Sequence, residues 1–463
     1  MANCGIELDA NCRHSKIGLN QALAEPLGGT LKVCERVLVG SGLPRMLRWI
    51  ALLAATVSSW VPAWAGDLPG VTHRDGMRAC PTFGTGFFYI PGSDTCVRLG
   101  GRVRAELLIN PTWSRLQDGV GSRVRGRIEA ETRNATDYGT LRAYVRVDST
   151  VSTGAYSRSI PSIDTTGSYY KSDTVLARAL IQFVGFTAGR YSSFFDFYAG
   201  ALSWGGTKLG SSQGSINGAA YTYAFSKGLS ATLAFEDGDE RAVEDGNYIA
   251  AARPMPDVVA NLRLDQDWGS AQLSIAGHQI RPAYNDAFIS GHATYGWAVQ
   301  GGLKFELPAL ATGDQLWLQA SYANGALNYL GLKEKSFRIG GLRYTLSDVV
   351  FADNSMQLMA GYSLTAAFAH YWVPTVRHSL FGNYTAVIPT SAAIASSSSI
   401  SKAGLIQLGT NLTWSPLKDL DIGGEIIWFQ LAGSNTVSSA VPGQAPLSRD
   451  SGLQYRMRLQ RDF

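Results

Sequence analysis

Apolar and charged residues alternate at every second position over long stretches of this chain. Between residues 97 and 109, Val97, Leu99 and Val103 would share one face of an extended strand, and Arg102 and Arg104 would share the other. A repeat of two is the side-chain period of a β-strand. A strand with one apolar face and one charged face requires an apolar medium on one side and water on the other.

The same alternation recurs along the chain to its last residue. After residue 65 no run of 18 apolar residues occurs, so the sequence predicts no transmembrane helix. It predicts sixteen strands instead, near residues 97–109, 122–132, 139–148, 174–183, 186–191, 216–225, 228–236, 257–265, 270–281, 293–306, 314–323, 356–371, 376–388, 404–414, 420–430 and 453–463.

The connections between the predicted strands alternate in length. Those after odd-numbered strands are long, such as 149–173 and 324–355, and those after even-numbered strands are short, such as 184–185. Bacterial outer-membrane barrels combine long extracellular loops with short periplasmic turns. Because unpaired backbone groups in hydrocarbon are costly, such a sheet must close on itself. We therefore expect an all-β, antiparallel transmembrane barrel over 97–463. The 324–355 connection is long enough to hide a further hairpin near 336–346, which would alter the strand count.

Residues 46–65 have the pattern of a secretory signal. Arg48 supplies positive charge, residues 49–57 form a short apolar core, and Ala63-Trp64-Ala65 is a small-x-small cleavage site. A membrane anchor or a buried helix is the alternative. Residues 1–45 precede this complete signal without a strong pattern of their own. We interpret them as an upstream extension produced by a start codon assigned too early.

Two cysteines, Cys80 and Cys96, follow the predicted cleavage site. An even number of cysteines in an exported chain predicts a disulfide, because the compartment is oxidising. The bridge would lie in a periplasmic segment over 66–96 and would stabilise its loop by about 3 kcal/mol. Two free thiols are the alternative.

Five segments of the chain resemble one known family. They are the stretch from Cys80 to Gly101, Phe186-Thr187-Ala188-Gly189-Arg190 with the following Ser193-Phe194-Phe195-Asp196-Phe197-Tyr198, His370-Tyr371-Trp372-Val373-Pro374, Asn411-Leu412-Thr413-Trp414-Ser415-Pro416, and the ending Leu459-Gln460-Arg461-Asp462-Phe463. Together they are similar to the alphaproteobacterial porins of the rhizobial and Brucella type.

The resemblance implies a general diffusion porin of the bacterial outer membrane. Such a protein is a sixteen-stranded, trimeric, water-filled pore for small hydrophilic solutes and ions. It also implies that the third extracellular loop, here about 192–215, folds into the barrel and narrows it. The expected partners are outer-membrane lipid, two further copies in a homotrimer, the barrel assembly machinery and small hydrophilic solutes. We expect no cofactor, no metal and no nucleic acid, since a net charge of +4 is too weak to indicate the last.

Charged residues on the lumenal face would set ion preference. Asp196 lies in the predicted third loop and would oppose the basic residues of the first three strands. A second interpretation is that these basic residues pair with Glu106, Glu129, Glu131 and Asp148 and only hold the wall together. The basic candidates for the channel lining are Arg102, Arg104, Arg123, Arg125, Arg127, Arg142 and Arg146.

Four aromatic residues complete the candidate set. Phe194, Phe195 and Phe197 are expected to anchor the third loop against the wall, or else to contact the solute directly as in sugar channels. Phe463 ends an alternating last strand, which resembles the signal read by the barrel assembly machinery. A residue of the interfacial aromatic girdle is the alternative for Phe463.

Three rival functions remain open at this point. A solute-specific channel, for a sugar for instance, would use the same fold, because lumen residues tune selectivity without changing it. An enzyme would need a nucleophile or metal beside a histidine, and the sequence shows no metal-ligand spacing, phosphate loop or nucleophile elbow. His278 is expected on the lumenal face as a wall residue. A purely structural barrel or adhesin would not conduct.

Overall fold

The computed structural model of the chain describes residues 78–112, 118–156, 170–204, 214–243, 249–284, 293–332, 336–339, 342–352, 355–396, 402–437 and 447–463. The predicted upstream extension (1–45) and signal peptide (46–65) lie outside the described residues. None of the helices in the described part of the chain is long and apolar enough to span a bilayer.

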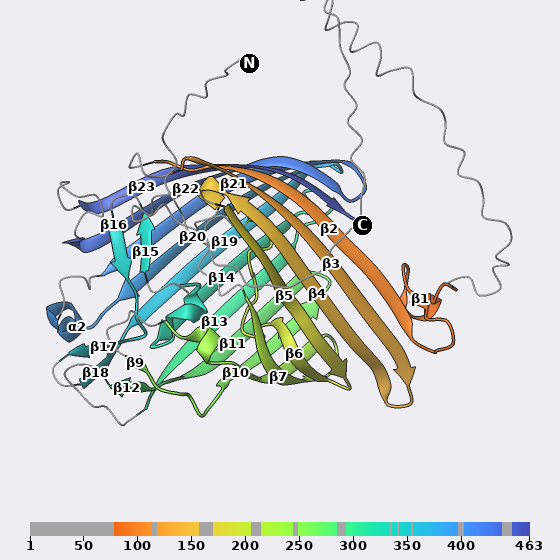
Figure 1. The fold of residues 1–463 in the computed structure, drawn as a ribbon, viewed down its shortest axis with the longest axis horizontal. Helices are drawn as coiled ribbons and strands as arrows, with labels where there is room; N and C mark the ends of the chain where they lie inside the picture. Colours follow the sequence, from red (N-terminus) through yellow and green to blue (C-terminus); the bar gives the residue numbers. More distant parts are fainter. Residues whose placement is uncertain are drawn as a thin grey trace, which may run out of the picture. The chain divides into compact units, whose positions relative to one another are not determined.

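The described residues form one large antiparallel sheet in which each strand pairs with the next along the chain (Figure 1). The barrel strands are β2 (Cys96–Ile109), β3 (Val120–Thr136), β4 (Gly139–Thr153), β5 (Tyr170–Phe183), β6 (Phe186–Ser192), β7 (Ser215–Ala224), β8 (Leu229–Glu236), β10 (Asp257–Gln266), β11 (Gly269–Ile280), β13 (Thr294–Glu306), β14 (Gln315–Asn324), β19 (Ala360–Val373), β20 (Val376–Ile388), β21 (Ala403–Leu417), β22 (Leu420–Val437) and β23 (Leu447–Asp462).

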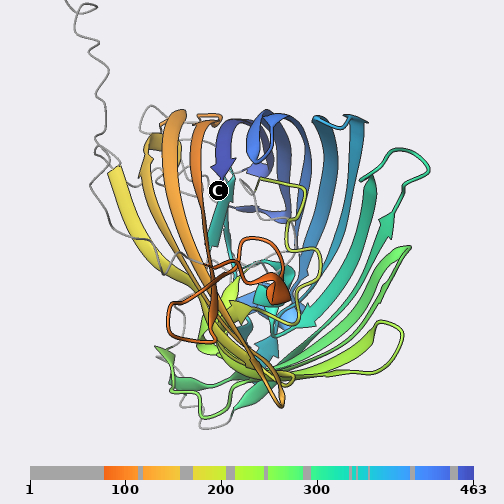
Figure 2. The same ribbon diagram turned by 90° about the vertical axis from the view of Figure 1, so that its right-hand side faces the viewer.

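The first and last of these strands close the sheet into a cylinder. β2 pairs with β23 from Arg102 opposite Asp462 to Ile109 opposite Tyr455. In Figure 2 the orange strands that begin the barrel stand beside the blue strands that end it. The prediction of a closed barrel of sixteen antiparallel strands is therefore confirmed, with every strand in its expected place.

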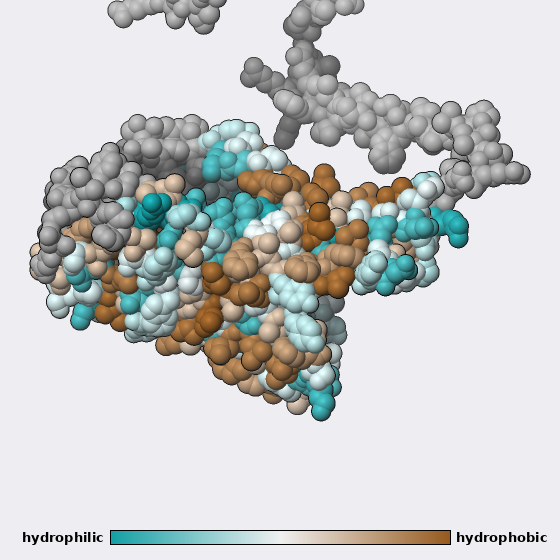
Figure 3. All heavy atoms as spheres, turned by 90° about the horizontal axis from the view of Figure 1, so that it is seen from below, coloured by the Kyte–Doolittle hydropathy of each residue, from teal (hydrophilic) through white to brown (hydrophobic). Residues whose placement is uncertain are grey.

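The two faces of the wall differ as the alternation predicts. Large apolar side chains such as Leu99 and Ile128 are 72% and 69% exposed on the outer face. Polar side chains such as Ser274 and Gln300 are buried on the inner face, at 0% and 1% exposure. Figure 3 shows apolar surface gathered over the outside of the barrel wall. An exposed apolar exterior on this scale is stable in lipid and not in water.

The connections alternate between short turns and long loops. β5 and β6 are joined by Val184 and Gly185 alone, both with positive φ (48° and 84°), as the tight turn of a hairpin requires. The long connections carry structure of their own: η2 (Gly154–Tyr156), η3 (Asp239–Arg241), β9 (Ile249–Ala250) with β12 (Pro282–Tyr284), η4 (Leu327–Leu330), β17 (Val349–Ala352) with β18 (Ser355–Leu358), and α2 (Ser391–Ser396).

The connection between β14 and β19 does hold a short hairpin, and this hairpin lies outside the barrel sheet. β15 (Ser336–Ile339) pairs with β16 (Leu342–Thr345) as a separate two-stranded sheet. It therefore adds no strand to the wall.

A small disulfide-bonded unit precedes the first barrel strand. Cys80 and Cys96 are bridged, with their Cα atoms 6.1 Å apart, so the predicted disulfide is confirmed. The bridge packs against Phe87, and all three residues are buried. The unit also contains η1 (Pro81–Phe83) and β1 (Phe88–Tyr89), which pairs with the start of β2.

Candidate functional site

The predicted basic residues line the inner face of β2, β3 and β4. Alternation places Arg102 and Arg104 of β2 on the same side as Arg123, Arg125 and Arg127 of β3, because the register sets Arg102 opposite Arg127 and Arg104 opposite Arg125. β4 adds two more arginines in register with this group, Arg142 and Arg146.

Most of these arginines pair with carboxylates of the same wall. Asp148 accepts hydrogen bonds from Arg127 Nε and Arg146 Nη2, both at 2.8 Å. Arg102 Nη2 donates to Asp462 at 2.8 Å across the closing seam. Glu131 accepts from Arg142 Nε at 2.7 Å, and Glu106 accepts from Arg123. These five arginines therefore form the ion pairs that the second interpretation of the basic residues expects within the wall.

Two arginines differ from the rest. Arg104 Nε donates to the amide oxygen of Gln460 at 2.9 Å, and Arg125 Nε donates to the hydroxyl of Thr150 at 2.8 Å. Both partners are neutral. Among the described residues neither guanidinium has a carboxylate within ion-pair distance.

The chain after β6, residues 193–204, is held by inner-face side chains of many strands. At its start, Glu236 at the end of β8 accepts hydrogen bonds from Ser193 Oγ (2.8 Å) and the Phe194 N–H (3.0 Å). Further on, Gln300 of β13 donates to the Phe195 carbonyl at 2.8 Å. Gln319 of β14 accepts from the Tyr198 N–H at 2.9 Å. The 193–204 segment therefore follows the inner face from β8 to β14.

The far end of the 193–204 segment is held by the last three strands of the barrel. Asn411 of β21 donates to the Leu202 carbonyl at 2.7 Å. Glu425 of β22 accepts from the Trp204 N–H, and Arg456 of β23 donates to the Trp204 carbonyl, both at 2.7 Å. Because β23 closes against β2, the segment ends beside the arginine wall.

The predicted loop aromatics pack against side chains of the wall and of the long connections. Phe195 is fully buried and meets Tyr329 of η4 edge to face, with ring centroids 4.7 Å apart. Phe197 is buried beside Trp317 of β14, at a centroid distance of 5.2 Å. Phe194 is half-buried against Tyr191, also at 5.2 Å.

Asp196 stands between Phe195 and Phe197 in the sequence and is itself only partly buried. Its main-chain carbonyl accepts a hydrogen bond from Gln272 at 3.3 Å. Its carboxylate acts electrostatically on Arg241, a buried arginine of η3 that also stacks on Tyr329 at 4.5 Å. The structure does not bring Asp196 into an ion pair with the predicted arginines of β2, β3 and β4.

A buried polar cluster beside this segment was missed by reasoning from the sequence. His278 Nδ1 donates to the Asp257 carboxylate, with N–O distances of 2.8 and 2.9 Å, and the Tyr329 hydroxyl donates to the same carboxylate at 2.7 Å. Asp348 accepts from the main-chain N–H groups of Leu327 and Val243, both at 2.7 Å.

This cluster ties two long connections to the inner wall. Burial raises the pKa of Asp348, which lies in the connection between β14 and β19. Alternation alone places His278 on the inner face, so that part was predictable. Its partners were not, because they lie on another strand and in a distant connection.

Phe463 lies at the closing seam. Its N–H donates to the Gly101 carbonyl at 3.1 Å, and its carbonyl accepts from the Gly101 N–H at 2.9 Å. Its ring is largely exposed on the outer side. Within the described residues no three His, Cys, Asp or Glu side chains are grouped as metal ligands would be.

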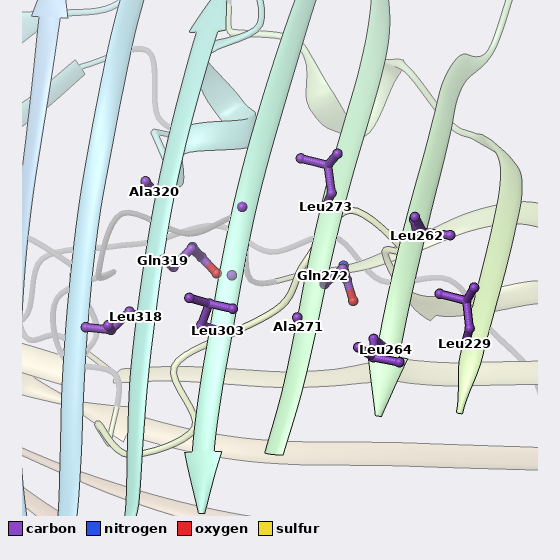
Figure 4. Close-up of a pocket in the computed structure, with 12 residues that line it drawn as sticks. Leu229, Leu262, Leu264, Ala271, Gln272, Leu273, Leu303, Leu318, Gln319 and Ala320 are labelled. Carbon is purple, nitrogen blue, oxygen red and sulfur yellow. The ribbon is translucent and has the colours of Figure 1, made fainter. Parts of the chain in front are cut away.

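The outer face carries a shallow apolar hollow over β8 to β14 (Figure 4). Leu262, Leu273, Leu303 and Leu318 line it, and the figure shows them on neighbouring strands. It offers no polar group besides Gln272 and Gln319, whose side chains are engaged on the inner face by the 193–204 segment. The hollow is part of the apolar exterior.

Comparison with known proteins gives one consistent result. A family model described as "Porin subfamily" matches residues 75–451. The chain is 28% identical over 293 residues to porin Omp2b of Brucella abortus (strain 2308), an alignment that covers 55% of this chain and 78% of the relative. The protein of Brucella neotomae with the same name is 27% identical over 299 residues, covering 57% and 80%.

Solved structures show the same fold at lower sequence identity. The outer membrane channel DcaP of Acinetobacter baumannii superposes with a TM-score of 0.61 at 15% identity, covering 81% of this chain and 99% of that one. A likeness at this identity concerns the architecture and not the solute.

Proposed function

Because the chain belongs to the porin subfamily, we propose that it forms a general diffusion pore in the outer membrane, through which small hydrophilic solutes and ions pass down their gradients. The protein is an integral β-barrel of that membrane. It supplies a polar path through lipid, and the free energy for transport comes from the solute gradient.

The polar inner face of a closed barrel is the observation that carries this proposal. The wall encloses arginines, carboxylates and amides on its inner side, and an apolar exterior surrounds them. Charged side chains at the centre of a bilayer are costly unless they face protein or water. A file of such residues along the inside of a barrel is the expected lining of an aqueous channel.

The 193–204 segment would set the width of this channel. Hydrogen bonds to residues of β8, β13, β14, β21, β22 and β23 support a course across the barrel from one part of the wall to another. Phe195 and Phe197 would serve as its anchors, because their rings are used in packing against Tyr329 and Trp317.

A general pore fits the aromatic packing better than a sugar-specific channel does. A sugar-specific path needs aromatic faces that are open to the solute. The buried rings of Phe195 and Phe197 offer none. Arg104 and Arg125, by contrast, are only partly buried and would face the solutes that pass.

Assembly into a homotrimer and insertion by the barrel assembly machinery belong to the same proposal. The exposed apolar exterior supports contact with lipid and with further copies. Cross-linking of the protein in detergent, followed by gel electrophoresis without heating, would give a trimer band. A monomer band alone would contradict the trimer and leave the pore standing.

Single-channel recording on the refolded protein in planar bilayers tests the pore itself. A general pore predicts steps of conductance that rise in proportion to KCl concentration and are insensitive to millimolar sugar. Saturation with solute or block by one sugar would support the solute-specific alternative. Folded, inserted protein without any conductance would contradict both and leave a structural barrel.

A further inference from the structure

Two arginines of the inner wall face each other directly across neighbouring strands. The register of β2 and β3 sets Arg104 opposite Arg125. Side chains directly opposite on one face of an antiparallel pair have Cβ atoms about 5 Å apart. Like charges at that separation destabilise the pair, so the arrangement costs stability unless something compensates it.

The adjacent row of the same two strands shows how compensation is achieved within the wall. Arg102 stands opposite Arg127, and a carboxylate flanks each of them: Asp462 holds Arg102 and Asp148 holds Arg127. That row is therefore electrically balanced.

The row of Arg104 and Arg125 is built in the same way but with neutral residues at its ends. Gln460 of β23 stands beside Arg104, and Thr150 of β4 stands beside Arg125. The nearest acid on β2, Glu106, is already bound by Arg123 and Arg458. Over the four strands β23, β2, β3 and β4 this row thus carries two positive charges and no carboxylate, and the next acids along it, Asp421 and Asp173, stand beyond Gln460 and Thr150.

Most N–H donors of each guanidinium in this row remain available to a ligand. The hydrogen bond of each runs through Nε, to Gln460 in one case and to Thr150 in the other. The terminal nitrogens of both residues make no hydrogen bond to the described residues. A planar guanidinium fork is the side chain best suited to bind a carboxylate or phosphate through two parallel hydrogen bonds.

We propose that Arg104 and Arg125 form a binding subsite for the oxyanion group of a permeating solute, a carboxylate or a phosphate held between the two guanidinium groups. The subsite rests on the proposed pore, since the solute reaches it only through the channel. It makes the protein a pore that passes small organic acids and phosphates in preference to neutral solutes of equal size.

Block of the chloride current by oxyanions tests this subsite. The probes are sodium succinate and sodium phosphate, added separately in the millimolar range to single channels of the full refolded protein in KCl. Sodium bromide at equal charge concentration is the reference, because bromide has no oxygen atoms. We expect one or both oxyanions to lower the conductance at concentrations at which bromide does not. Succinate alone would assign a carboxylate site, phosphate alone a phosphate site.

The decisive variant is R104Q/R125Q. It should raise the half-blocking concentration of the oxyanion on the order of tenfold. The reason is that a charge-assisted hydrogen bond of this kind contributes roughly 1.4 kcal/mol or more. The matched control is R98Q/R133Q. It also removes two positive charges, one from β2 and one from β3. Arg98 and Arg133 differ from the subsite pair because both bind Glu131, and Glu131 retains its ion pair with Arg142 in this control. Succinate and phosphate should block the control channel at the same concentrations as the unaltered channel.

A second variant keeps the test decisive if the glutamine variant folds poorly. R104K/R125K retains both charges but loses the forked geometry. It should keep the anion preference measured by reversal potential and lose most of the oxyanion block.

Three results would overturn the subsite. Succinate and phosphate could block the unaltered channel no better than bromide, the block could survive in the glutamine and lysine variants, or the control could lose as much block as R104Q/R125Q. A channel that conducts KCl but ignores oxyanions would refute the subsite alone. A protein that does not conduct at all would refute the proposed pore together with it.

Discussion

The ring of Phe197 occupies the space that a side chain at Gly302 would need: a Cβ on Gly302 would lie 2.2 Å from Cδ1 of Phe197. Gly302 belongs to the inner face of β13, and Phe197 belongs to the chain that follows β6. The wall is therefore shaped to receive the segment. The missing side chain at one position and the buried ring at the other are a single packing feature.

Replacing Gly302 by valine should release this part of the 193–204 segment. Overpacking of this kind costs about 1–3 kcal/mol, which exceeds the worth of a single hydrogen bond that holds the segment. We expect a larger and noisier single-channel conductance. The control is Gly301→Val, because a Cβ at Gly301 has no atom within 4 Å. Equal conductance in both variants would show that the segment does not limit the current.

Removing the charge of Asp196 should shift the ion selectivity of the pore toward anions. At roughly 8 Å in water a unit charge changes the energies of potassium and chloride by about 0.5 kcal/mol each, in opposite directions. Salt at about 0.1 M roughly halves both effects, so the permeability ratio of potassium to chloride should fall about twofold. The reversal potential of Asp196→Asn in a KCl gradient measures it. Asp419→Asn, in the turn between β21 and β22, is the matched control. An unchanged ratio would show that the charge of Asp196 does not act on the permeating ions.

Loss of the disulfide should loosen only the unit before β2. Cys80 and Cys96 are 16 positions apart, and a loop of this length is stabilised by about 3 kcal/mol on the chain-entropy account. In C80S/C96S, chymotrypsin should cut near Phe87 on the order of a hundredfold faster, while the conductance stays as it was. Equal digestion of the oxidised protein and the variant would mean that packing around Phe87, not the bridge, holds this unit.

The ring of Phe463 should promote assembly in the outer membrane, in addition to the main-chain hydrogen bonds that Phe463 contributes where β2 meets β23. Its two main-chain hydrogen bonds to Gly101 remain in Phe463→Ala, whereas deletion of Phe463 removes them. If the ring is the recognised feature, both variants lower the yield in the outer membrane. Refolding of Phe463→Ala in detergent should be unaffected. Normal outer-membrane yield of the alanine variant would restrict Phe463 to the aromatic girdle.

The strands could be predicted because their signal is local. Alternation at period two assigns each residue of β3, for example, to one face without knowledge of its neighbours. The short turn Val184-Gly185 and its counterparts then force successive strands to pair. Several ion pairs followed from this as well, since Glu106, Glu131 and Asp148 sit on strands adjacent to the arginines.

The attachments of the 193–204 segment could not be predicted, because they join residues that are distant in the sequence. Trp204 and Glu425 are 221 residues apart, and Tyr198 and Gln319 are 121 apart. Nothing in either neighbourhood marks the partner. The same holds for Gln460 beside Arg104, which becomes a neighbour only when the barrel closes. The distinction between balanced and unbalanced arginines therefore needed the structure.

Neighbouring residues of one barrel strand face water and lipid in turn. Single cysteines at residues 128 and 129 of β3 test this alternation most directly. Glu129 lies on the inner face, where its carboxylate accepts a hydrogen bond from the Tyr144 hydroxyl, whereas Ile128 is exposed on the outer face. We predict that a membrane-impermeant thiol reagent modifies Glu129→Cys and lowers its single-channel conductance, and leaves Ile128→Cys unmodified in lipid. Equal modification of both positions, or modification of residue 128 alone, would contradict a closed barrel around an aqueous pore.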